Sequence, residues 1–464
     1  MISIYLDWGI ISQLRQGKYP ELKELLFQKD KFLIPYSSSH IGDLIPDKNY
    51  DGSNEEINKD LNFLSELTEN RCFNFYQKKL VLDKIDPRSY YNERIETNKA
   101  FDDFGMETFK ELSKEFNDPN SPINTIFDKY RDIPIDPKFL EGINNPEWGL
   151  ESNFFYPDLK DNPTIDGLLK SSWKMFQNLF EEDGYAKLRQ ITQKGMGVNR
   201  DKMFNQENPF GLIEKLNERH GFNPKEHLNA GKYVSPTWFD NFCADYLLLD
   251  MYGFQEDKIN IGKGRKQTMR NTNDDALHAT FASVCHFYII NDKRSFQKTK
   301  EVYNKYNLGT IPLSPEDFIK YANNYLYSRS IKDDLQIPFN YFELEPEKIT
   351  KKENGHKLVS YFCDFYLVDF FNNIHGIVNE EGILQRVILA QALPMNKESL
   401  YPLEIETLLE KLFNHFGHDV HGKGRPSAES MYKDAWNDIE WSIGEVKFLL
   451  VLNLNSLELH CYLN

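Results

Sequence analysis

The sequence has few cysteines and no long apolar run, and these two absences exclude several classes of protein. Its 464 residues include five scattered cysteines with no Cys-x-x-Cys spacing, so neither a disulfide framework nor a thiolate zinc site is indicated. No segment approaches the roughly 18 apolar residues of a membrane-spanning helix. No secretory signal is visible, because Asp7 interrupts the first apolar stretch and no basic segment precedes it. We therefore expect a cytoplasmic protein without a membrane partner.

The chain also lacks the common signatures of nucleotide-binding and serine-dependent enzymes. Gly262 and Gly264 resemble a phosphate loop only loosely, because the full Walker spacing is absent, and no G-x-S-x-G motif occurs. The net charge of −16 argues against binding nucleic acid over the whole surface. A local basic strip remains, since the segment from Lys258 to Lys300 holds nine Lys and Arg against three Asp.

Two short apolar runs in the sequence each end in an aspartate. Ile2–Leu6 leads into Asp7, and Phe287–Ile290 leads through Asn291 into Asp292. Runs of β-branched and aromatic residues predict strands that are buried on both faces, as in a parallel sheet. The carboxyl ends of such strands are where open α/β sheets bind their ligands. The sequence therefore predicts a ligand site that contains both aspartates.

The order of the predicted elements indicates an α/β fold whose central parallel sheet, flanked by helices, is interrupted in sequence. Residues 1–46 and 236–325 are expected to form the two parts of this domain. Residues 47–235 alternate amphipathic stretches with breaks rich in Pro, Asn and Asp, which predicts a large, mostly helical insertion. Residues 326–464 are expected to form a separate C-terminal α+β region. Its predicted elements are helices near 356–375, 380–391 and 402–416 and a hairpin from 445–454 and 457–463.

Capping signals locate several elements of the sheet domain. Ser37 to Ser39 supply hydroxyl groups for the N-terminus of a helix that carries His40 and Asp43. Another helix is expected to open at Asp274 and Asp275. The further expected elements are helices at Trp8–Gln16, Thr237–Tyr252 and Ser295–Tyr306 and strands at Phe32–Tyr36 and Thr310–Leu313.

Four aspartates fall where the predicted sheet would bring them together. Asp7 and Asp292 follow strands, Asp43 lies early in a helix, and Asp275 is expected at a helix start. Clustered carboxylates are costly to keep ionised unless a cation lies among them. Hard oxygen ligands without Cys pairs favour Mg²⁺ or Mn²⁺ over zinc. Such a site activates water for in-line attack on a phosphodiester.

The residues around these acids resemble the PIN-domain nucleases. The segments that carry the resemblance are Tyr5-Leu6-Asp7, Ser39-His40-Ile41-Gly42-Asp43-Leu44, Asn273-Asp274-Asp275-Ala276-Leu277-His278-Ala279 and Ile289-Ile290-Asn291-Asp292. Their order is an acid after the first strand, an acid on an early helix, an acid opening a late helix, and an Asn-Asp strand end. The resemblance covers about 1–46 and 236–325. Two features depart from the family: Asp43 stands where Glu is more frequent, and the insertion is large.

The resemblance implies a metal-dependent ribonuclease. It assigns metal binding and catalysis to Asp7, Asp43, Asp275 and Asp292, and it favours RNA over DNA, with toxin, RNA-turnover and phage-defence roles all open. Basic residues that flank the acids would hold the phosphates of the strand, although a solvated face explains them equally well. These residues are Lys263, Arg265, Lys266, Arg270, Lys293 and Arg294. The acidic bulk of the chain would limit non-specific cleavage or face a regulatory protein partner.

Two alternatives remain beside this hypothesis. A non-catalytic PIN-like scaffold would bind RNA or a protein partner through the added regions. His415, His418 and His421 would offer three imidazoles to zinc, but Gly417 and Gly422 break the helix that would align them, which favours a polar loop.

The two histidines nearest the acids have a structural interpretation. His40 and His278 each lie three residues from a candidate ligand, and this spacing favours packing or hydrogen bonding to the ligands over metal binding. Asn291 would either position a metal-bound water or phosphate, or turn the strand end.

Overall fold

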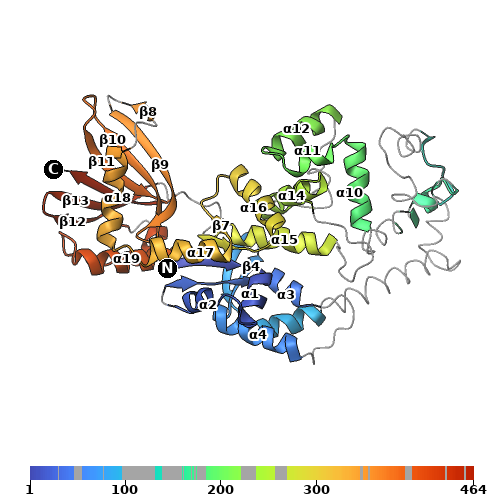
Figure 1. The fold of residues 1–464 in the computed structure, drawn as a ribbon, viewed down its shortest axis with the longest axis horizontal. Coiled ribbons are helices and arrows are strands. Elements are labelled where there is room, and N and C mark those ends of the chain that lie inside the picture. Colours follow the sequence, from blue (N-terminus) through green and yellow to red (C-terminus); the bar gives the residue numbers. More distant parts are fainter. Residues whose placement is uncertain are drawn as a thin grey trace.

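The structure is a computed structural model, and only part of the chain is described. The described residues are 1–29, 31–45, 55–76, 78–96, 131–137, 159, 161–168, 170–171, 174, 184–220, 237–256, 269–344, 349–353, 356–391, 400–433, 436–453 and 456–463. They build a small parallel sheet at the centre, a group of helices on one side of it and a large antiparallel sheet on the other (Figure 1).

The central sheet is parallel, as the apolar runs predict. Its strand order is β2-β1-β6-β7, and the register sets Tyr5 of β1 beside Tyr288 of β6. The strands are β1 (Ile2–Leu6), β2 (Phe32–Leu33), β6 (Phe287–Ile289) and β7 (Ile311–Leu313). Every residue of β1 and β6 is buried, because helices cover both faces of the sheet.

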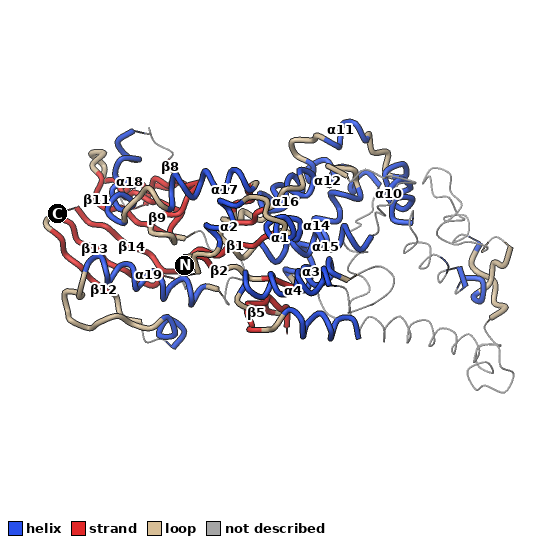
Figure 2. Tube along the Cα trace, turned by 60° about the horizontal axis from the view of Figure 1, so that its bottom comes forward, coloured by secondary structure: helices blue, strands red, loops and turns tan. Residues whose placement is uncertain are grey.

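Alternate residues of the central strands enter two different hydrophobic cores. Ile4 and Leu6 face the core formed with α1, α2, α4 and α17, whereas Tyr5 faces the core formed with α14, α15 and α16. The helices are α1 (Trp8–Arg15), α2 (Pro20–Leu26), α3 (Ser38–Leu44), α4 (Glu55–Thr68), α14 (Trp238–Met251), α15 (Met269–Ala282), α16 (Lys293–Lys305) and α17 (Pro315–Tyr321). Figure 2 shows these helices in a second view.

The strand expected at Phe32–Tyr36 is wrong as a single element. Pro35 separates β2 from a further short strand, β3 (Tyr36–Ser37), because proline has no N–H with which to continue a ladder. β3 joins a second sheet of order β3-β4-β5, with β4 (Arg71–Tyr76) parallel to it and β5 (Lys79–Lys84) antiparallel to β4. The segment expected to begin a helical insertion therefore also contains a hairpin.

The middle region is otherwise helical where it is described. Its helices are α10 (Gly184–Gly195), α11 (Arg200–Phe204) and α12 (Pro209–His220). The amphipathic stretch at 99–116 lies outside the described residues. Buried ionic contacts fasten α10 to the sheet domain, because Asp250 of α14 lies 3.0 Å from Arg189 Nη1 and 3.1 Å from Lys298 Nζ of α16.

The C-terminal region is an antiparallel sheet of order β12-β13-β14-β11-β10-β9-β8. Helix α19 (Tyr401–Phe416) and the hairpin of β13 (Val446–Asn453) and β14 (Ser456–Leu463) confirm the predictions there. The helices expected near 356–375 and 380–391 are wrong, since these segments form strands. The remaining elements are β8 (Ile349–Glu353), β9 (His356–Leu367), β10 (Phe371–Val378), β11 (Leu384–Ala390), β12 (Ile439–Ile443) and helix α18 (Ile331–Leu344).

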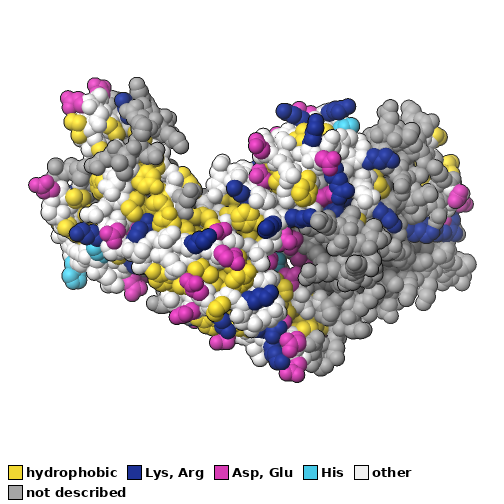
Figure 3. Space-filling view, viewed as in Figure 1, with side chains coloured by type: hydrophobic (Ala, Val, Ile, Leu, Met, Phe, Trp, Pro, Cys, Tyr) yellow, Lys and Arg dark blue, Asp and Glu magenta, His cyan; other side chains and the backbone are white. Residues whose placement is uncertain are grey.

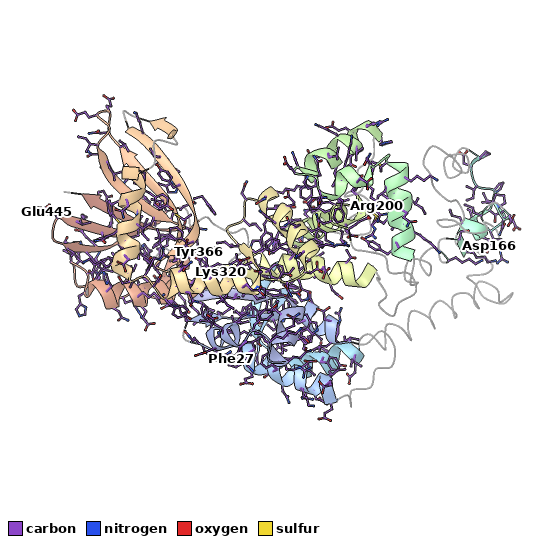
Figure 4. The ribbon with its side chains drawn as sticks, viewed as in Figure 1. Phe27, Asp166, Arg200, Lys320, Tyr366 and Glu445 are labelled. Atoms are coloured by element: carbon purple, nitrogen blue, oxygen red, sulfur yellow. The ribbon has the colours of Figure 1, made fainter. Side chains whose placement is uncertain are left out.

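The junction between the central and C-terminal sheets is polar as well as apolar. Ser3 Oγ of β1 lies 2.8 Å from His286 Nδ1 and donates to Glu404 Oε1 of α19 at 3.2 Å, and all three residues are buried. The Tyr366 ring, labelled in Figure 4, stacks edge-on against His286 with centroids 4.4 Å apart. Among the described helices, none has the length and apolarity needed to span a bilayer.

Candidate active site

Asp7 lies at the carboxyl end of the central strand and begins the next helix. Its Oδ2 accepts a hydrogen bond from the backbone N–H of Gly9 at 3.1 Å, which caps α1. Burial raises the pKa of Asp7, and the nearby charges of Asp43 and Asp292 raise it further, while His278 lowers it. The fold therefore brings Asp7, Asp43 and Asp292 from three segments into one electrostatic neighbourhood.

Asp43 is held by a buried histidine. Its Oδ2 lies 2.8 Å from His278 Nε2 of α15, and the His278 side chain is only 1% exposed. Burial alone lowers the pKa of His278, but the hydrogen bond and charge of Asp43, together with Asp7 and Asp275, raise this pKa to about 9. His278 therefore carries a positive charge at neutral pH and offsets part of the negative charge of the acids.

The buried hydroxyl group of Tyr5 contacts the His278 ring of this pair. Tyr5 Oη is 2.9 Å from His278 Nδ1, 2.6 Å from Ser37 Oγ and 3.3 Å from His40 Nδ1. His40 also caps α3 with Ser37, and its Nε2 lies 2.8 Å from the carbonyl oxygen of Leu6. Both ring nitrogens of each histidine thus have protein partners. This geometry agrees with the interpretation of the histidines as hydrogen-bonding residues rather than ligands.

The acids of α15 lie inside the helix and do not open it. The helix begins at Met269, so the expectation that Asp274 and Asp275 form its N-terminus is wrong. Asp275 acts electrostatically on His278 and Tyr288. Asp274 packs against α3, because a Cβ on Gly42 would lie 3.4 Å from Asp274 Oδ1. Gly42 precedes Asp43, so Asp274 is an additional acid that the sequence analysis attributed to helix capping.

Asp292 follows β6 and caps α16. Its Oδ1 accepts hydrogen bonds from the backbone N–H groups of Arg294 and Ser295, each at 2.8 Å. The residue is exposed, as is Asn291 before it. Asp292 is therefore placed at the sheet edge as predicted, with one carboxylate oxygen used for capping.

The donor set has the chemistry of a Mg²⁺ or Mn²⁺ site, since it consists of carboxylates, and burial together with Asp43 and Asp292 raises the pKa of Asp7. The side-chain geometry is less complete. Within the described part of the chain, no three His, Cys, Asp or Glu side chains are arranged to hold a metal ion. Asp43 is turned toward His278, and Asp292 is turned toward backbone N–H groups. Convergence of the acids is thus present without a formed coordination shell.

Comparison with known proteins adds no identification. A scan against models of protein families, a search of curated proteins and a search of solved structures each found no match. The PIN-like assignment therefore remains a prediction that rests on the order of the motifs and on the geometry of the acids.

The basic residues divide into three groups. Lys263, Arg265 and Lys266 lie outside the described residues, as does the side chain of Arg270. Lys293 is exposed beside Asp292. On the face shown in Figure 3, Lys and Arg side chains are interspersed with Asp and Glu.

Two cations of the predicted strip are structural. Arg294 donates from Nη1 to the carbonyl oxygen of Glu256 at 2.6 Å, and its guanidinium lies over the Phe204 ring at 5.5 Å. Lys298 is fully buried against Asp250. Arg294 Nη1 thus connects two segments of the fold, and the expectation that Arg294 binds phosphate stays a prediction.

The three histidines near the C-terminus are divided between a helix and a loop, and they form no metal site among the described residues. Helix α19 ends at Phe416, and Gly417 adopts a φ of +79° that favours glycine. Asp419 organises the loop by accepting hydrogen bonds from the backbone N–H groups of His421, Lys423 and Gly424. The polar-loop interpretation therefore holds for His418 and His421, whereas His415 lies in the last turn of α19.

Proposed function

We propose that this protein is a metal-dependent PIN-like endoribonuclease that hydrolyses phosphodiester bonds. The observation that carries the proposal is that burial, Asp43 and Asp292 raise the pKa of Asp7, which follows β1 at the carboxyl edge of a parallel sheet. A carboxylate whose pKa is raised by burial and by neighbouring acids marks a site that gains stability from a bound cation. A toxin or phage-defence role is compatible with such an activity, and a regulatory protein partner would restrain it.

Asp7, Asp43, Asp275 and Asp292 would hold Mg²⁺ or Mn²⁺. When bound, the ion would supply an activated water and would neutralise charge on the phosphodiester. Asp7 and Asp292 are fixed by the helices that they cap, so their positions depend on the backbone and not on a flexible loop.

The remaining side chains orient the acids and contact the strand. His278 holds Asp43 Oδ2, and Tyr5 in turn fixes the His278 ring from the other side. Lys293, exposed next to Asp292, is placed to contact a phosphate. Lys263, Arg265, Lys266 and Arg270 remain proposed RNA-binding residues, and Arg294 takes the structural role described above.

A second candidate function is a non-catalytic scaffold that binds RNA or protein. The observation that favours it is the engagement of Asp43 with His278 and of Asp292 with α16, which leaves no three-ligand set among the described residues. In this case the acids would be held by protein contacts alone.

A nuclease assay with Mn²⁺ or Mg²⁺ separates the two functions. Wild type, Asp7→Asn and Asp275→Asn would be compared on labelled RNA and DNA, with Asp201→Asn, an exposed residue of α11, as the matched control. The nuclease proposal expects cleavage by wild type and the control and its loss in both site variants. Equal cleavage by all four proteins would eliminate it, and no cleavage by any folded protein would favour the scaffold.

A further inference from the structure

We propose that a cleft beside the acids binds a nucleobase of the RNA substrate, an inference that rests on the proposed function. The cleft has a volume of about 820 Å³, within the range of small-molecule sites. Ile290, Asn291 and Ser314 line it where strands β6 and β7 end. Asn291 directly precedes Asp292, so the cleft adjoins the proposed metal-binding acids at the ligand-binding edge of the sheet.

The lining of the cleft combines aromatic rings with primary amides. Phe254 and Phe296 form apolar wall, and Gln206, Gln255 and Gln297 lie among them. An aromatic ring offers a stacking surface to any base. A primary amide offers a donor and an acceptor side by side, which is the pattern needed to pair with the edge of a base.

The side-chain amides that line the cleft differ in whether they already hydrogen-bond to the protein. Gln255 donates from Nε2 to the carbonyl oxygen of Phe204 at 3.0 Å and to Asn205 Oδ1 at 3.2 Å, which fixes its own oxygen as an acceptor. The side chains of Asn291 and Gln297 are exposed and make no hydrogen bond to another residue in the described ranges. These two side chains can therefore exchange water for a ligand without breaking a protein contact.

The charges of the lining favour a base over a phosphate. The described lining residues include one cation, Lys293, beside the acids Glu207, Glu301, Glu316 and Asp317. Asp317 is engaged locally, since it accepts a hydrogen bond from the Ser314 hydroxyl at 2.7 Å. An acidic lining repels phosphate, whereas exocyclic amino groups of a neutral base find acceptors there. The base would thus enter the cleft while its phosphate stays near Asp292.

The helical middle region contributes one wall of the cleft. Asn205, Gln206 and Glu207 follow α11, and the Arg294 contacts with Phe204 and Glu256 hold this segment against α16. The inserted region would therefore shape the base-binding subsite, although it supplies none of the four acids.

A binding measurement that needs no cleavage tests the inference. Fluorescence anisotropy would follow the full-length protein, without divalent metal, binding a labelled single-stranded hexaribonucleotide. The same RNA would be measured with one abasic ribose placed at each position in turn. The cleft variants are Gln297→Ala, a change at an exposed position, and Phe296→Leu, which keeps the wall of the cleft apolar. Gln190→Ala, an exposed glutamine of α10, is the control.

We expect each cleft variant to bind intact RNA about tenfold more weakly, in line with the stacking contribution of one base. At one position, an abasic ribose should weaken wild type by the same factor and leave the cleft variants unchanged. The control should bind like wild type. Thermal melts of all variants would establish that they are folded.

Other outcomes would overturn the inference. Unchanged RNA binding in both folded variants, or equal losses with every abasic RNA, would show that no base occupies the cleft. Binding of an arginine-containing peptide that Glu301→Gln abolishes, without any effect on RNA, would assign the cleft to a basic protein segment. The proposed nuclease function fails differently, because Asp7→Asn would then cleave like wild type while the abasic pattern persisted.

Discussion

Asp250 and Asp7, two aspartates beside the parallel sheet, differ in the sign of the charges around them. Asp250 is fully buried between Lys298 and Arg189, and although burial raises its pKa, these two cations bring the pKa below its usual value. For Asp7, burial also raises the pKa, but here Asp43 and Asp292 raise it further, against the lowering effects of His278 and of the hydrogen bond from the Gly9 N–H.

The two clusters differ in their expected roles: one holds elements of the fold together, and the other is proposed to bind a ligand. The Asp250 cluster joins α10, α14 and α16, so full compensation is expected of a contact that holds the middle region in place. The Asp7 cluster joins strand ends and is left undercompensated, as is common where a ligand supplies the missing charge. The predictions below test this difference, beginning with the largest expected effect.

Breaking the compensated cluster should unfold the protein more readily. Asp250→Ala removes the carboxylate that pairs with the buried Lys298 and Arg189, and removing one partner of a buried pair costs about 3–5 kcal/mol. Chemical denaturation followed by circular dichroism would measure the change in the free energy of unfolding. Asp201→Asn, at the surface, should change it by less than about 0.5 kcal/mol. A similar small change in Asp250→Ala would contradict the structural role of the cluster.

Changing the undercompensated cluster should affect activity and spare stability. Asp7→Asn removes a charge that Asp43 and Asp292 oppose, so the melting temperature should stay equal or rise. RNA cleavage should fall at least about 100-fold, because loss of a ligand exceeds the usual effect of an outer-shell change. Parallel melting and cleavage measurements would check this. A large loss of stability with retained cleavage would reverse the comparison.

Asp334 is an intermediate case and predicts a pH dependence. Burial raises its pKa to about 6 in spite of Arg329 and a hydrogen bond from the Val368 N–H. The folded state therefore holds this proton more tightly than the unfolded state, and the resulting stability is complete below about pH 4 and is lost as the pH rises through about 6.

Asp334→Asn removes this proton linkage. Relative to wild type, the variant should gain about 2–3 kcal/mol of stability between pH 4 and pH 7. Denaturation curves at several pH values would measure the difference. A constant offset across this range would show that Asp334 keeps an ordinary pKa in the fold.

The smallest effect is expected for a change at Tyr5, whose hydroxyl group contacts His278 beside the acids. Tyr5→Phe removes the hydroxyl that contacts Ser37, His40 and His278, and the lost hydrogen bonds should cost about 1–3 kcal/mol of folding stability. Cleavage should fall less than in Asp7→Asn, because Asp43 keeps its bond to His278. Val302→Ala, a buried change in the neighbouring helix α16, controls for loss of stability alone.

Strands β1 and β6 of the central sheet could be predicted because they are apolar and each leads into an acid, Asp7 and Asp292 respectively. Strands β9 and β10 of the C-terminal sheet could not, because the reversal between them lacks the usual turn residues. Val368 and Asp369 link β9 to β10 with φ values of +53° and +54°, a conformation that a sequence normally announces with Gly or Asn. Without that signal, the dense apolar pattern of 356–375 fits a helix equally well.

The candidate site was predictable in its members and not in its contacts. The positions of Asp7 and Asp292 follow from strand ends, which the sequence displays. The engagement of Asp43 by His278 depends on how α3 packs against α15, and the two residues lie 235 positions apart. The cleft at Asn291 depends likewise on a wall supplied from the middle region.

The Ser3, His286 and Glu404 contacts have a consequence for work with fragments. A chain cut before α19 would leave the hydroxyl of β1 and the imidazole next to β6 facing solvent in place of the carboxylate they meet in the whole protein. The parallel-sheet domain is therefore unsuited to transplantation into another scaffold by itself. Engineering that exchanges other regions of the chain should retain α19 and Tyr366 together with the parallel-sheet domain.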